Sequence, residues 1–143
     1  MNRGQTAMEL QQALEKSARK VFKIFFGSRI YKKTLPMSGD RDVLGVDMLV
    51  ECEGPKRMSL FMERDTVRHV MGRLTDNNDA KNDQMAYDII SEMANIIAGT
   101  ALSSCQHHGG LSVPVRSAHR HAGGSKLSFA ARMGCFSIYL ADL

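Results

Sequence analysis

Apolar residues recur at helical spacing in three parts of the chain. Between residues 6 and 26 they stand three or four positions apart, which predicts an amphipathic helix. A second, shorter helix is expected to follow Asp65 as its N-terminal cap, with Val67, Val70, Met71 and Leu74 on one side. The third and longest helix is expected to run from about Asp83 to Ser104.

Alternating apolar and polar residues predict strands in the rest of the chain. The segment "VLGVDMLVECE" at 43–53 alternates, and a Gly-Pro turn at 54–55 predicts a hairpin with a returning strand at 57–63. Gly109 and Gly110 end the long helix, and Gly123-Gly124 and Gly134 divide the remainder into a three-stranded meander at about 111–116, 126–132 and 135–141. This order predicts an α+β fold in which helices pack on a mostly antiparallel sheet, with one domain over residues 1–143.

Length and composition fit a globular chain. Its 143 residues, 43% hydrophobic and 24% charged, suffice for a core without disulfides or structural metal. No stretch approaches the roughly 18 apolar residues of a membrane span, so no membrane insertion is expected. The N-terminus lacks an apolar signal core, and the three cysteines are widely spaced, so a cytoplasmic location with reduced cysteines is expected.

Positive charge is concentrated near the N-terminus. Residues 1–33 contain eight Lys or Arg and two Glu, a net charge of +6 in a chain whose total is +4. Such a region can bind nucleic acid, an anionic membrane or an acidic protein, or it can be a solvated helix face. It lacks the interleaved aromatic residues of single-strand binders, so no nucleic-acid partner is expected.

Histidines and a cysteine cluster after the long helix. The segments "CQHHGG" and "HRHAGG" contain ligand types that suit zinc: Cys105, His107, His108, His119 and His121. Their spacing matches no standard zinc pattern. A polar loop without a metal is the expectation.

The long helix carries a narrow polar stripe. At about 100° per residue, Asp88, Glu92, Asn95 and Gly99 fall on one side. A broad apolar stripe lies roughly opposite, made of Met85, Ile89, Ile90, Met93, Ile96 and Ile97. The polar stripe should therefore face outward.

Two residues make this stripe unusual for a merely solvated face. Asn95 is a poor helix former, and a mid-helix glycine such as Gly99 costs about 1 kcal/mol relative to alanine. Ala98 and Gly99 are also expected to leave a low surface beside Asn95, where the backbone of a partner can approach.

The segment "DIISEMANIIAG" closely resembles the signature helix of the CheC/CheX/FliY family of chemotaxis phosphatases. In that signature an Asp or Ser is followed by a Glu, an Asn and a later proline, which here match Asp88, Glu92 and Asn95. The continuation "NIIAG" is similar to CheX in particular, and the motif occurs once, as in CheX-like members. "LSVPV" at 111–115 resembles the strand with the family's proline, here Pro114, although the 18 residues between Asn95 and Pro114 are fewer than usual.

The resemblance implies a phosphatase that removes phosphate from the aspartyl-phosphate of a CheY-type response regulator. It implies that Asn95 positions the attacking water and that Glu92 docks on a receiver lysine. Asp88, Gly99 and Pro114 would support the contact with the partner. The catalytic Mg²⁺ would belong to the receiver, so no cofactor of its own is expected, and the chain would form a homodimer by sheet pairing.

Two other functions remain open from the sequence. The short interval between Asn95 and Pro114 also suits a non-catalytic module of the same fold that binds a response regulator or the flagellar switch. A nucleic-acid binder that uses the basic N-terminal region is the third interpretation.

Overall fold

The computed structural model describes residues 3–32, 43–52, 54–75, 83–104, 108–117 and 125–142. These residues form three helices and seven strands. In chain order the elements are α1 (Arg3–Phe26), β1 (Ile30–Lys32), β2 (Val43–Cys52), β3 (Pro55–Glu63), α2 (Arg64–Thr75), α3 (Asp83–Ser103), β4 (His108–Leu111), β5 (Val115–Arg116), β6 (Ser125–Ala131) and β7 (Gly134–Asp142). The α+β prediction is confirmed.

All three predicted helices are present, but α2 differs in detail from the prediction. It begins at Arg64, so Asp65 lies in its first turn and is not its cap. There the Asp65 carboxylate lies 3.7 Å from the guanidinium of Arg68. Three of the four apolar residues predicted on one side, Val67, Val70 and Met71, are fully buried and face the core as expected. The fourth, Leu74 near the end of the helix, is 40% exposed.

The sheet is antiparallel in every recorded strand pair, in the order β1-β6-β7-β3-β2-β4, with β5 also paired to β2. The predicted hairpin is β2 and β3, with Met48 opposite Met58. The predicted meander is wrong. β4 and β5 line the outer edge of β2, whereas β6 and β7 form a hairpin on the other side of β3. The segment predicted as one strand is divided by residues 112–114, and Gly109 and Gly110 belong to β4.

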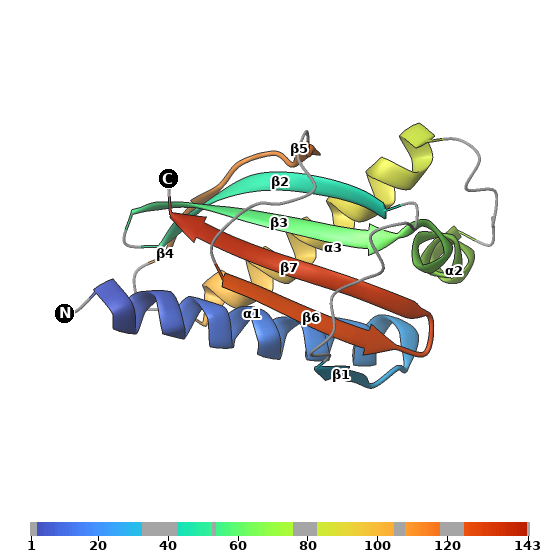
Figure 1. Ribbon diagram of the computed structural model, residues 1–143, viewed down its shortest axis with the longest axis horizontal. Coiled ribbons are helices and arrows are strands. Elements are labelled where there is room, and N and C mark those ends of the chain that lie inside the picture. Colours follow the sequence, from blue (N-terminus) through green and yellow to red (C-terminus); the bar gives the residue numbers. More distant parts are fainter. Residues whose placement is uncertain are drawn as a thin grey trace.

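The core lies between one face of the sheet and the helices α1 and α3, which cross behind it in the view of Figure 1. Alternate β2 residues, including Val46, Met48 and Val50, point into this core and are at most 2% exposed. The two helices are in direct contact, and the hydroxyl of Ser17 in α1 donates a 2.6 Å hydrogen bond to the carbonyl of Ile97 in α3. This buried hydrogen bond holds α3 against α1.

The described cysteines are reduced, and the described helices are too polar or too short to span a membrane. Cys52 is buried and Cys135 is half-buried, and both are free thiols. Cys105 lies outside the described residues. Within the described part of the chain, no helix is both long and apolar enough to cross a membrane.

Candidate functional site

The helix α3 presents the polar stripe to solvent, as its periodicity predicted. Asp88, Glu92 and Asn95 are exposed, and Gly99 is half-buried. The opposite side of the helix is buried through the residues Ala86, Ile90, Met93, Ala94, Ile97, Ala98, Ala101 and Leu102. Each polar side chain of the stripe therefore projects from a helix whose other side is fixed in the core.

Asn95 stands between buried residues of α3. Met93 and Ala94, which precede it, are at most 1% exposed. Ile97, two residues further on, is fully buried, and its carbonyl accepts the hydrogen bond of Ser17. A side chain on such a backbone has its starting atom held in place, so only its own rotamers remain free.

The segment from Leu111 to Arg116 lies beside the exposed side of α3. At one end, a Cβ added to Gly99 would lie 3.8 Å from Cδ1 of Leu111. At the other end, the guanidinium of Arg116 lies 4.1 Å from the ring centroid of Tyr87. The segment and the helix therefore run side by side in opposite directions, and Pro114 is a buried residue between these two contacts.

This arrangement changes the prediction of a low surface beside Asn95. Ala98 is only 1% exposed and belongs to the core, so that part of the prediction is wrong. Gly99 does leave its side of the helix free of a side chain, but Leu111 occupies the adjoining space. A partner would meet the edge of Leu111 together with the glycine.

Asp88 belongs to a chain of hydrogen bonds that begins within α3 and continues to β5. The amide nitrogen of Gln84 donates to the Asp88 carboxylate at 2.9 Å. The amide oxygen of Gln84 accepts from Arg116 at 3.2 Å. Arg116 comes from β5, 28 positions after Asp88, and nothing local in the sequence signals this contact. The chain ties the first part of the stripe to the neighbouring segment.

Glu92 and Asn95 differ from Asp88 in their hydrogen bonding. Among the residues that the structure describes, neither side chain has a recorded hydrogen bond or ion pair. Glu92 thus offers a carboxylate acceptor, and Asn95 offers an amide with both donors and an acceptor. Because they stand three positions apart on a helix, they are neighbours on its surface and can act on one bound partner.

Leu111 provides an apolar border to the stripe, because it lies beside Gly99 and is 38% exposed. Val113 is 81% exposed on the same segment, whereas Val115 pairs with Asp47 and therefore points to the sheet face away from α3. The surface around Glu92 and Asn95 therefore combines polar groups with an apolar margin, a combination that suits contact with another protein.

The candidate zinc ligands fall largely outside the described residues, namely Cys105, His107, His119 and His121. His108 is the first residue of β4. Within the described ranges, no group of three or more His, Cys, Asp or Glu residues is arranged to hold a metal ion.

A protein-family model matches more than half of the chain. The family model described as "Chemotaxis phosphatase CheX" matches residues 49–138. A comparison with curated protein sequences finds no match.

Solved structures show the same fold at low sequence identity. The chain is similar to the chemotaxis protein CheX from Vibrio vulnificus, with a TM-score of 0.72 and 18% identity over 93% of this chain and 98% of that one. It is also similar to CheX in a CheX–CheY–BeF3–Mg²⁺ complex from Borrelia burgdorferi, with a TM-score of 0.61 and 12% identity over 91% and 95%. FliY from Thermotoga maritima gives a TM-score of 0.66 and 11% identity over 99% and 91%.

Proposed function

The chain belongs to the CheX family of chemotaxis phosphatases, and from this premise we propose that it hydrolyses the aspartyl-phosphate of a CheY-type receiver domain. One observation carries the assignment of the site. Glu92 and Asn95 project side by side from the solvent-facing side of α3, without recorded partners in the described residues. They are therefore available to a second protein.

The reaction needs little covalent work from this chain. In an acyl phosphate the leaving group is a carboxylate, so the bond from its oxygen to phosphorus breaks readily. The oxygen of water forms the new bond to phosphorus, the aspartate carboxylate departs, and the proton of the water passes to the phosphate. Catalysis then depends on placing the water in line and on stabilising charge.

Asn95 suits the task of holding the water. Its amide can accept a hydrogen bond from the water and donate another to a phosphoryl oxygen without changing its own charge. The buried residues on both sides of Asn95 hold its backbone, which limits the positions that the amide can occupy. Asn95 acts as a positioning group for the nucleophile and not as a strong base.

Glu92 suits the task of docking. Its exposed carboxylate lies one turn before Asn95 and can pair with a lysine of the receiver. Asp88 supports this face from within the Gln84–Arg116 chain of hydrogen bonds. Gly99 and Pro114 shape the border through which the two proteins meet.

The remaining components come from the partner and from assembly. The similar CheX from Borrelia burgdorferi occurs in a complex with CheY, BeF3 and Mg²⁺. BeF3 is a mimic of the phosphoryl group, and by analogy the metal of this reaction is held by the receiver. The proposal includes a cytoplasmic homodimer formed by sheet pairing, in which residues 1–143 act as one phosphatase domain.

A second function rests on the distance along the chain from Asn95 to Pro114. Because only 18 residues separate them, the surface beside Asn95 can differ from that of active relatives. The chain would then bind a receiver or the flagellar switch without turnover.

The test follows phosphate loss from a CheY-type receiver that has been phosphorylated with a small-molecule donor in the presence of Mg²⁺. Reactions without added protein, with the wild-type chain and with Asn95→Ala are compared. Faster phosphate loss with the wild-type chain, but not with Asn95→Ala, supports the phosphatase. Binding of the phosphorylated receiver without faster loss assigns the non-catalytic role, and the lack of both overturns the choice of partner.

A further inference from the structure

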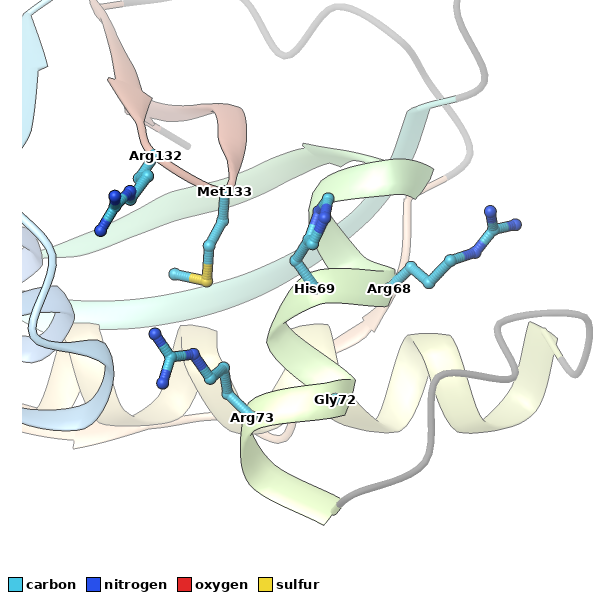
Figure 2. A pocket seen from close by; sticks show the side chains of 6 residues that line it. All are labelled: Arg68, His69, Gly72, Arg73, Arg132 and Met133. Atoms are coloured by element: carbon cyan, nitrogen blue, oxygen red, sulfur yellow. The ribbon is translucent and has the colours of Figure 1, made fainter.

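A pocket of about 490 Å³ lies between α2 and the turn that joins β6 to β7. It is well within the size range of small-molecule sites. Its lining residues are Arg68, His69, Gly72, Arg73, Arg132 and Met133 (Figure 2). None of them belongs to α3, so the pocket is distinct from the Glu92 and Asn95 stripe.

The helix α2 contributes four of these residues for a simple geometric reason. Arg68 and Gly72 stand four positions apart, as do His69 and Arg73, so all four share one side of the helix. The other side carries Val70 and its buried neighbours and faces the core. The side that lines the pocket is thus rich in cations, and Gly72 leaves room between them.

The opposite wall is held in place by the first turn of α2. Arg132 and Met133 form the turn between the paired residues Ala131 and Gly134. The hydroxyl of Thr66 donates to the carbonyl of Cys135 at 3.4 Å, which connects α2 to the start of β7. The two walls therefore keep a defined separation.

Among the described residues around this pocket, positive charge exceeds negative charge. Arg68 has one carboxylate nearby, Asp65 at 3.7 Å. Within the described part of the chain, no ion pair is recorded for Arg73 or Arg132. Figure 2 shows Met133 between the side chains of Arg73 and Arg132, whereas Arg68 points away from them. A concave surface lined by such cations concentrates positive potential and attracts an anion.

We propose that this pocket binds a small molecule that carries two or more phosphate groups, either free pyrophosphate or the phosphate tail of a nucleotide. Each planar guanidinium presents a fork of donors that matches phosphate oxygens. Two such forks, from Arg73 and Arg132, can engage neighbouring phosphates. Met133 supplies an apolar surface between them, and the missing side chain at Gly72 admits the ligand. This binding does not depend on the phosphatase activity proposed for α3.

Isothermal titration calorimetry tests the site with pyrophosphate in one arm and ADP in the other, without Mg²⁺ and at low salt so that exposed charges are weakly screened. The variants are Arg73→Gln and Arg132→Gln. Lys126→Gln is the matched control, because it removes one exposed positive charge at the opposite end of β6. Circular dichroism confirms that each variant is folded, which is expected because the altered side chains are exposed.

Saturable binding of one ligand per chain is expected for the wild type and for Lys126→Gln, and each arginine variant should weaken it by about tenfold. Tighter binding of ADP than of pyrophosphate assigns the nucleotide, and the reverse assigns the free polyphosphate. The absence of saturable binding in both arms overturns the proposal. An equal loss in Lys126→Gln also overturns it, since the binding would then reflect general surface charge.

Discussion

Two truncations on α3, only two positions apart, should have opposite consequences. Asn95→Ala removes an exposed amide that has no recorded partner in the described residues. Met93→Ala removes a side chain that is 1% exposed and packs in the core. If α3 is a functional surface on one side and a packing surface on the other, the first variant should lose activity and the second should lose stability.

The magnitudes follow from burial and helix propensity. Asn95→Ala sacrifices no packing and introduces a better helix former, so the free energy of unfolding should rise by about 0.5 kcal/mol. Met93→Ala leaves a cavity in a close-packed core, which should cost about 3 kcal/mol. For a chain of this size these values correspond to a melting temperature about 2 °C higher and about 10 °C lower, respectively.

Activity should be lower in Asn95→Ala than in Met93→Ala, the reverse of their order in stability. Without the amide of Asn95 the attacking water is no longer held in line, and the stimulated loss of phosphate should slow by roughly 100-fold. Met93→Ala should keep most of its activity at a temperature well below its melting point, because the exposed side of α3 is unchanged. Circular dichroism on heating measures stability, and phosphate release from a phosphorylated receiver with Mg²⁺ measures the rate.

A control variant separates the role of Asn95 from a general effect of removing a surface amide. Gln12→Ala truncates an exposed amide on α1 and should leave both the rate and the melting temperature close to those of the wild type. The reasoning is refuted if Asn95→Ala retains the wild-type rate. It is also refuted if the rate of Asn95→Ala falls only in step with a large loss of stability.

The other predictions address docking and the fold. Glu92→Ala should weaken receiver binding and dephosphorylation together, each by about tenfold, through the loss of a charge pair. An unchanged receiver concentration at half-saturation in a titration would contradict this. Val113→Asp places a charge on a residue that is 81% exposed beside α3 and should weaken receiver binding by about tenfold. In the same titration Ile24→Asp, at a 65% exposed position on α1, should have little effect, and equal losses would argue against docking beside α3. Gly134→Ala should lower the free energy of unfolding by about 2–4 kcal/mol. Its φ of 134° disfavours a side chain, and a Cβ there would collide with buried Thr66, so wild-type stability in urea denaturation would count against this account.

The sequence by itself determined the helices and strands in which apolar residues recur at a regular spacing. The helical periods predicted α1 and α3, and the alternation in residues 43–53 predicted β2, because the orientation of a side chain follows from its position in the element. The same periodicity placed Asp88, Glu92 and Asn95 on the exposed side of α3. This part of the candidate site needed no knowledge of tertiary contacts.

Only the tertiary structure decided how distant segments meet. The predicted meander was wrong because the order of strands in a sheet depends on which edges are free, and the free edge of β2 receives β4 and β5. That placement brings Arg116 to Gln84 and Leu111 to the vicinity of Gly99, which completes the surroundings of the stripe. The basic pocket has the same origin, since α2 and the turn between β6 and β7 are far apart in the chain and adjacent only in the fold. Local patterns determine which way a residue faces along its own element, whereas packing determines what it faces.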